Sequence, residues 1–184
     1  FELCHKENVL FIADEIQTGF VRTGQWFAST HENIEPDLIT LAKGIAGGMP
    51  LSAVTGRAEV MDSVHTGGLG GTYGGNPVAV AAGIASLEVM EEENLAAKAV
   101  RIQEVITEHF QQVQQTDPRV GDSRGRGAMM AVEFVDPQPK APLPDLVNEI
   151  AAAARLEGVI TLTAGTYGNV LRFLPPVVIG EDLL

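Results

Sequence analysis

Cysteine, basic residues and long apolar runs are all scarce in this sequence. The single cysteine, Cys4, cannot form an internal disulfide, which favours a reducing compartment, and we expect a cytoplasmic protein. With 12 basic against 24 acidic residues, the net charge of −12 repels nucleic acid and anionic membrane surfaces, so neither is expected as a partner. No apolar run reaches the roughly 20 residues that a membrane-spanning helix needs. We therefore expect a soluble protein.

The usual spacings of metal ligands are missing as well. The four histidines, His5, His31, His65 and His109, are dispersed and show no metal-ligand spacing with Cys4, so no metal site is expected. Apolar residues, in contrast, make up 45% of the 184 residues. A chain of about this size can bury roughly 70% of the surface that it exposes when unfolded. It is long enough to hold a hydrophobic core.

Apolar runs alternate with helical patterns along the chain, as is typical of a parallel sheet with crossover helices. Three continuous apolar runs predict buried strands, at residues 9–13, 38–42 and 51–55. Asn76 and Pro77 are suited to the N-cap and the first turn of an apolar helix that continues to about Met90. From residue 94 to residue 113, apolar residues recur every three or four positions, which predicts a long amphipathic helix.

The last third of the chain predicts a smaller unit of strands and one helix. The expected elements are a strand over residues 127–135, a helix over residues 146–157 that ends at Gly158, and strands over residues 159–163 and 169–174. The long helix is expected to bridge the two parts. Because the sequence begins and ends within such patterns, we expect a chain that is truncated at both ends.

Asp14, Lys43 and a glycine-rich loop form the pattern that predicts chemistry. Each of the two side chains follows an apolar strand, and open α/β sheets bind ligands at the carboxyl ends of their strands. A dehydrated lysine has a pKa below its reference value of about 10.4, and its neutral amine can condense with a carbonyl. The loop GGLGGTYGGNP, residues 67–77, offers backbone amides and the Thr72 hydroxyl to an anion such as phosphate.

Together, these features match what pyridoxal phosphate requires from a protein. Asp14 is suited to keep the ring nitrogen protonated, and Lys43 to bind the aldehyde and to move the substrate proton. Each feature also has a plain structural explanation, as a turn aspartate, a lysine at the solvent end of a strand and a glycine turn. A hydrolase with paired carboxylates is excluded, because Asp14 and Glu15 are adjacent on a strand and point to opposite faces.

Three separated segments resemble the class III aminotransferases of fold type I, in the same order and at matching spacing. They are FIADEIQTGFVRTGQWFA, PDLITLAKGIAGGMPLSAV and GGLGGTYGGNPVAVAA. The resemblance implies an α/β fold, with a mainly parallel sheet that carries helices on both faces. It places residues 1–100 in the C-terminal part of a large domain that binds pyridoxal 5'-phosphate. Residues 101–184 then form an α+β small domain without its final helix.

The same resemblance implies a role for each matching residue. Asp14 pairs with the pyridine nitrogen, Gln17 reaches the phenolic oxygen of the ring, and Lys43 is the Schiff-base lysine. Thr72 holds the phosphate of the cofactor in the neighbouring subunit, which implies an obligate homodimer or a dimer of dimers.

Two later segments, RGRGAMMAVEFVDPQ and GVITLTAGTYGNVLRFLPP, resemble those members of the family that act on 4-aminobutyrate. The implied reaction transfers its amino group to 2-oxoglutarate and gives succinate semialdehyde and glutamate. The resemblance implies that Arg172 receives the α-carboxylate of glutamate or 2-oxoglutarate, and a guanidinium can hold a carboxylate through two parallel hydrogen bonds. The alternative is that Arg172 pairs with a structural acid.

Other functions stay open at this point. The donor could instead be ornithine, putrescine, 5-aminovalerate or the substrate of an aminomutase. A reading from a different class is a catalytically silent phosphate-binding or assembly module, although such a module has no use for Lys43. The resemblance also implies a glutamate that covers Arg172, a second arginine and an aromatic residue stacked on the ring, and none of these lies in the sequence.

Overall fold

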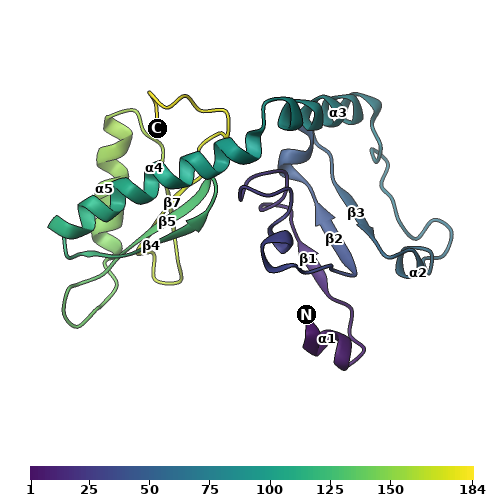
Figure 1. Ribbon diagram of the computed structural model, residues 1–184, viewed down its shortest axis with the longest axis horizontal. Helices are drawn as coiled ribbons and strands as arrows, with labels where there is room; N and C mark the ends of the chain where they lie inside the picture. Colours follow the sequence, from purple (N-terminus) through teal and green to yellow (C-terminus); the bar gives the residue numbers. More distant parts are fainter. The chain divides into compact units, whose positions relative to one another are not determined.

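The computed structural model describes residues 1–184, which form two compact units, Phe1–Ala96 and Ala97–Leu184 (Figure 1). Each unit contains its own β-sheet together with helices, so the α/β class that the sequence predicts is confirmed. The helix α4, Leu95–Thr116, begins in the first unit and continues into the second. The division into a large and a small domain at residue 100 stays a prediction. None of the helices is both long and apolar enough to cross a membrane.

The first unit holds a three-stranded sheet in the order β1-β2-β3. β1, Ile12–Asp14, and β2, Leu38–Leu41, are parallel, whereas β3, Ala53–Gly56, is antiparallel to β2. The connection between β2 and β3 contains only the 3-10 helix η2, Lys43–Ala46. A parallel pair needs a crossover of about a dozen residues or more, so this short connection favours an antiparallel third strand. The sheet of the first unit is thus mixed, with one parallel and one antiparallel pair, where the sequence predicts a mainly parallel sheet.

Asp37 holds one end of this sheet together. Its side chain is buried. The carboxylate accepts a hydrogen bond from the backbone N–H of Phe11 at 2.7 Å and another from Nη1 of Arg57 at 2.7 Å. Phe11 directly precedes β1, and Arg57 directly follows β3. These hydrogen bonds from Phe11 and Arg57 hold the pKa of Asp37 below its ordinary value. The ionised carboxylate therefore connects all three strands at one end of the sheet.

The helix α3, Pro77–Glu92, forms where the sequence predicts it. Its N-cap, Asn76, accepts the N–H groups of Val78 at 2.9 Å and Ala79 at 3.4 Å through Oδ1, as the residue type predicts. Gly83 lets this helix approach the rest of the unit, because a Cβ there would lie 3.2 Å from the Leu51 side chain. The shorter helices of this unit are α1, Glu2–Lys6, η1, Ala28–Glu32, and α2, Ala58–Met61.

The second unit holds a four-stranded antiparallel sheet in the order β4-β5-β7-β6. Its strands are β4, Val120–Arg126, β5, Met129–Phe134, β6, Leu162–Ala164, and β7, Val170–Phe173. Along β5 the burial alternates, because successive side chains point to opposite faces of a sheet. One face therefore carries the core, and the other carries the polar side chains.

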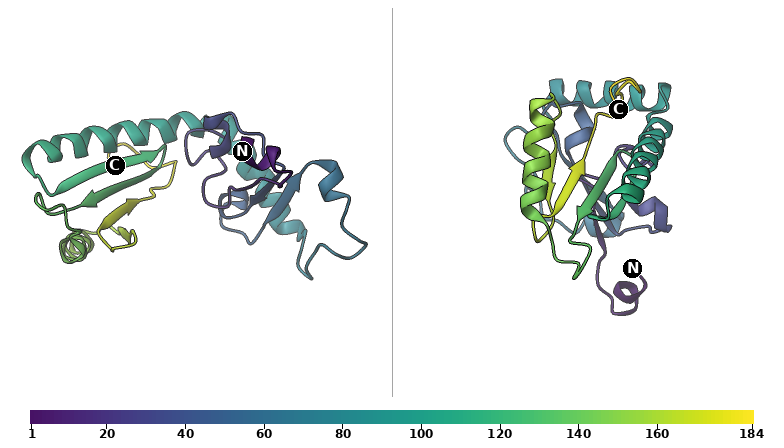
Figure 2. Two further views of the ribbon diagram at one scale, coloured as in Figure 1. Left: turned by 90° about the horizontal axis from the view of Figure 1, so that it is seen from below. Right: turned by 90° about the vertical axis from the view of Figure 1, so that its left-hand side faces the viewer.

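The helices α4 and α5, Pro144–Leu156, pack on the core face, and Figure 2 shows both beside the strands of this unit. Val132, Phe134 and Leu171 meet Val147 of α5, while Met130 meets Ile102 and Ile106 of α4. The amphipathic patterns of both helices are confirmed. In an antiparallel pair, directly opposite residues face the same side, so the register places Asp122, Arg124, Glu133 and Arg172 together on the other face.

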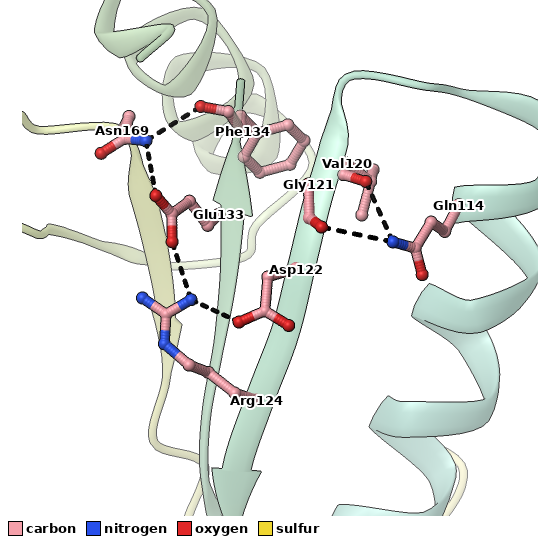
Figure 3. A network of polar contacts seen from close by, with 8 residues as sticks. All are labelled: Gln114, Val120, Gly121, Asp122, Arg124, Glu133, Phe134 and Asn169. Carbon is pink, nitrogen blue, oxygen red and sulfur yellow. Dashed lines mark hydrogen bonds and ion pairs between the residues drawn. The ribbon is translucent and has the colours of Figure 1, made fainter. Parts of the chain in front are cut away.

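The strand β4 is the element that the sequence pattern misses, since no strand was expected before residue 127 in this part of the chain. Its sequence, VGDSRGR, is polar and contains two glycines, both of which weaken a strand signal. Figure 3 shows what holds the strand in place: Arg124 lies between Asp122 at 2.7 Å and Glu133 at 2.8 Å. Gly125 has a φ of +148°, and a Cβ there would lie 2.2 Å from the Met129 carbonyl oxygen. Contacts across the pair thus decide this strand.

The strands of the first unit are less buried than the sequence predicts. The apolar runs at residues 9–13, 38–42 and 51–55 were expected to be buried on both faces, yet Ile12 is 55% and Val54 is 49% exposed. In the described chain, no helix covers these side chains as α4 and α5 cover the second sheet. The three predicted strands are therefore confirmed, but the prediction that they are buried is wrong for β1 and β3, whereas β2 is half-buried and ends at the buried Leu41.

Candidate active site

Asp14 is the last residue of β1, and Thr40 lies directly opposite it on β2. The carboxylate of Asp14 is exposed, and its Oδ1 accepts the backbone N–H of Ile16 at 3.1 Å and the Thr40 hydroxyl at 3.1 Å. β2 ends one residue after Thr40, and Lys43 begins η2 two residues later. The structure therefore places Asp14 at the carboxyl end of β1 and Lys43 just after the carboxyl end of the adjacent parallel strand β2, as the sequence predicts.

Lys43 has a backbone φ of +49°, in the left-handed region that non-glycine residues rarely adopt. Strained residues of this kind cluster at functional sites, so this geometry motivates a functional role for Lys43. Its side chain is exposed. The dehydrated surroundings that the sequence predicts for the amine are thus not formed by the described residues. Gln17, the second residue after Glu15, is partly buried.

Glu15, the residue after Asp14, is only 2% exposed, whereas Asp14 is exposed. Its carboxylate accepts hydrogen bonds from the Thr18 hydroxyl and from the backbone N–H groups of Ala28 at 3.0 Å and Ser29 at 2.7 Å. Burial raises the pKa of Glu15, but the bonds from Thr18, Ser29 and Ala28 outweigh it and hold the pKa below its ordinary value. The ionised carboxylate thereby fastens the loop after β1 to the start of η1.

The glycine-rich loop borders a cavity of about 870 Å³. Its walls are residues 50–54 and residues 69–75, and Thr72 is among them, exposed. Gly70, with a φ of +135°, and Gly75, with a φ of +70°, give the loop a path that other residues do not readily follow. The first free N–H groups of α3 are already bonded to Asn76. An anion in this cavity would therefore depend on the Thr72 hydroxyl and the loop amides.

Arg172 lies on β7, in the second unit. It lies opposite Ala131 of β5 and Leu162 of β6, on the face that the helices leave uncovered. Its Nε is buried and has no hydrogen-bond partner among the described residues. An unpaired buried donor is costly, so Nε is a suitable donor for a carboxylate from outside the described residues. A salt bridge from Arg172 to a structural acid, the plain alternative, is not formed.

Three residues of the site region were missed by the sequence interpretation. The hydrogen bonds of Glu15 come from residues up to 14 positions away, and only the strand alternation hinted at its burial. Thr40 becomes relevant through the register of β1 and β2, which no sequence signal indicates. Phe20 has a φ of +57°. Its Cβ lies 3.5 Å from the position that a Cβ would take on Gly44, the residue after Lys43. No described group of three or more His, Cys, Asp and Glu could hold a metal ion.

Comparison with known proteins gives matches over the whole chain. Residues 1–184 match the family described as Aminotransferase class-III. A 4-aminobutyrate aminotransferase from Mycobacterium leprae is 54% identical over 181 residues, which are 98% of this chain and 41% of that protein. A 5-aminovalerate aminotransferase from Pseudomonas putida is 47% identical over 182 residues, 99% of this chain and 43% of that protein. The chain thus spans about two fifths of the length of these curated relatives.

Solved structures share the fold at lower identity. An ornithine aminotransferase from Toxoplasma gondii superposes with a TM-score of 0.87 at 37% identity, and covers 98% of this chain with 42% of its own. An aminotransferase from Bacillus anthracis gives a TM-score of 0.91 at 33% identity, over 99% of this chain and 43% of its own. The fold of each part of this chain is therefore that of a segment within these larger proteins.

Proposed function

The chain belongs to the class III aminotransferases, and from this premise we propose that the whole protein transfers the amino group of 4-aminobutyrate to 2-oxoglutarate. The products are succinate semialdehyde and glutamate. The observation that carries the proposal is the likeness over the whole chain to curated 4-aminobutyrate aminotransferases. A second candidate donor is 5-aminovalerate, which the similarity to the Pseudomonas proteins supports.

The cofactor of this proposal is pyridoxal 5'-phosphate, and the described residues fit it. Asp14 ends β1, Lys43 just follows the adjacent parallel strand β2, and Thr72 lines a cavity with the loop amides. When bound, the cofactor supplies an electron-withdrawing ring that takes up the electron pair left when a proton leaves the substrate carbon. The exposed carboxylate, amine and hydroxyl of these residues are available to bind it.

Each residue has a defined task in this proposal. Asp14 accepts the hydrogen bond of the protonated ring nitrogen, and the negative charge keeps that proton in place. Gln17 bonds the phenolic oxygen of the ring. The Nζ of Lys43 would hold the cofactor, and it would act as general base and acid toward the proton of the substrate carbon.

Arg172 is proposed to bind the α-carboxylate of glutamate and 2-oxoglutarate. Its buried, unpartnered Nε supports this role, since a carboxylate would satisfy the donor. 4-Aminobutyrate has no carboxylate beside its reacting amine and would leave the guanidinium unpaired. The proposal therefore also requires a carboxylate from outside the described residues that covers Arg172 in that half-reaction.

A homodimer is part of the proposal because Thr72 is assigned to the phosphate of the partner's cofactor. Its exposure in the described chain is consistent with a task outside the subunit. Sedimentation of the whole protein tests the dimer. The cytoplasmic location expected from composition stays a prediction.

The decisive experiment is Lys43→Ala in the whole protein, with amino transfer and the visible absorption of the cofactor as readouts. We expect a loss of turnover of at least about 1,000-fold, since general acid–base catalysis alone contributes about 100- to 10,000-fold. Lys140→Ala, in an exposed loop, is the matched control and should keep wild-type turnover. Near-normal turnover of Lys43→Ala would refute the mechanism.

Arg172→Ala separates the two half-reactions. We expect the kcat/KM for glutamate to fall about 100-fold, which corresponds to about 2.7 kcal/mol, while 4-aminobutyrate is affected far less. A donor profile of the wild-type protein distinguishes the two candidate donors. A clear preference for 5-aminovalerate over 4-aminobutyrate would replace the first candidate with the second.

A further inference from the structure

The hydrogen bonds of Asp14 are distributed unequally over its two carboxylate oxygens. Oδ1 accepts both the backbone N–H of Ile16, at 3.1 Å, and the hydroxyl of Thr40, at 3.1 Å. Oδ2 receives no hydrogen bond from the described residues. One oxygen is therefore anchored to the protein, and the other is left for a donor from outside the described residues.

An aspartate needs such an anchor for geometric reasons. The terminal torsion of a carboxylate is broad and roughly two-fold, so the side chain alone does not fix the plane in which its oxygens lie. The N–H of Ile16 belongs to the loop directly after Asp14 and follows the same backbone. Thr40, in contrast, comes from the neighbouring strand, where the parallel register places it opposite Asp14. The Thr40 hydroxyl thus ties the carboxylate to β2, the strand that leads to Lys43.

We infer that Thr40 is a positioning residue that holds Oδ1 of Asp14 and so presents Oδ2 to the ring nitrogen of the cofactor. This inference rests on the proposed function and deepens it. Thr40 does not touch the reacting atoms in this account. It acts through Asp14 alone, by restricting the rotation of the carboxylate and by donating to the oxygen that the ring does not use.

The test compares Thr40→Val with Thr40→Ser in the whole protein. Valine has the shape of threonine without the hydroxyl, and serine keeps the hydroxyl. The first readout is the dissociation constant of pyridoxal 5'-phosphate, from an absorbance titration of the apoprotein. The second is the thermal midpoint of the apoprotein. Thr55→Val, an exposed threonine on β3, is the matched control for the same change in the same sheet.

We expect Thr40→Val to raise the dissociation constant about 3- to 10-fold, the effect of one hydrogen bond to a charged or polar group. Thr40→Ser and Thr55→Val should remain within about 2-fold of the wild type, because neither removes this bond. The thermal midpoint of the apoprotein should not change in any variant, since the hydroxyl is exposed. A purely structural role would lower that midpoint together with the affinity.

The inference is overturned if Thr40→Val binds the cofactor as tightly as the wild type, or if Thr40→Ser loses as much affinity as Thr40→Val. If Thr40→Val does not fold, Thr40→Ala takes its place against the same serine variant. A wild-type protein that binds no pyridoxal 5'-phosphate contradicts the proposed function itself. The two failures are therefore distinguished by the wild-type titration.

Discussion

The two units of this chain differ in how far they complete their own cores. In the second unit, α4 and α5 cover one sheet face, and Val132 of β5 and Val147 of α5 are fully buried in the core. In the first unit, the apolar side chains of β1 and β3 remain half exposed, and α3 exposes Val78 and Ile84. The proposed cofactor residues lie in this less covered unit. In the described chain, the unit assigned to the chemistry is thus the one whose apolar side chains are less covered.

The largest expected effect is on the core of the second unit. Phe134 is 6% exposed and packs in the cluster with Val120 and Leu171. Phe134→Ala should destabilise the 184-residue chain by about 3–5 kcal/mol, because it removes apolar contacts and leaves a cavity. Val54→Ala, at a half-exposed site of β3, should change stability by no more than about 0.5 kcal/mol. Urea unfolding of the two variants measures this contrast.

Equal losses in Phe134→Ala and Val54→Ala would contradict the difference in burial between the two units. The same two variants are then measured in the whole protein. If the rest of the protein covers β3, Val54→Ala should there cost about 2 kcal/mol, because the change deletes two buried methyl groups at roughly 1 kcal/mol each. An unchanged value for Val54→Ala in both proteins would mean that β3 stays exposed in the assembled molecule.

A smaller effect is expected at Glu15, the buried carboxylate in the loop after β1. Glu15→Gln should destabilise the whole protein by about 2 kcal/mol at pH 7, since hydrogen bonds to a charged group contribute about 1.5–3 kcal/mol. Glu35→Gln, at an exposed position, is the matched control and should be neutral. A neutral Glu15→Gln would show that the loop after β1 does not need its buried carboxylate.

The stability difference between wild type and Glu15→Gln should depend on pH, because the pKa of Glu15 is lowered in the fold. A group with a lowered folded pKa contributes its full stability above the ordinary pKa, about 4.3 for glutamate, and loses it as the pH falls through the folded value. The difference between wild type and Glu15→Gln should therefore be constant from pH 7 to about pH 5 and shrink below about pH 4. Urea midpoints across this range measure it.

The smallest effect is expected at an exposed ion pair of the second unit. Nη2 of Arg119 lies 2.6 Å from Oδ2 of Asp117. Hydrogen bonds from the side chain and the backbone N–H of Arg119 lower the pKa of Asp117 to about 2. Arg119→Ala should raise this pKa part of the way to the ordinary value of about 3.9, because the backbone bond from residue 119 remains. The thermal midpoint should change by no more than about 2 °C, as exposed pairs contribute little. NMR titration and thermal unfolding give the two values, and a large drop in the midpoint would contradict the prediction.

Long, strongly patterned elements could be predicted from the sequence. The helices α3, α4 and α5 and the strands β5 and β7 lie close to their expected bounds, because apolar periodicity and caps are local signals. β4 could not be predicted, since its polar segment is held by pairing with β5 and by the bonds of Arg124. The antiparallel direction of β3 depends on the length of a connection rather than on any residue pattern.

Some residues of the candidate site could likewise be predicted from the sequence, and others could not. Residue types and their order were enough to select Asp14, Lys43 and Thr72, because a carboxylate, an amine and a glycine-rich loop each carry their chemistry in the sequence. The supporting residues were not visible. Thr40 reaches Asp14 across 26 positions, and Glu15 bonds a helix start 13 and 14 positions away. Such contacts exist only once strands and loops are placed beside each other.

The family, the alternation of apolar segments and the residues suited to bind a cofactor can be predicted from the order of residues alone, because these depend on side-chain chemistry and on local spacing. Tertiary structure alone decided which oxygen of Asp14 is anchored, which carboxylate of the Asp14–Glu15 pair is buried, and that Arg172 keeps a buried donor without a partner. Hydrogen bonds are short-ranged and directional, so they are fixed by the register of distant strands and not by the order of residues along the chain.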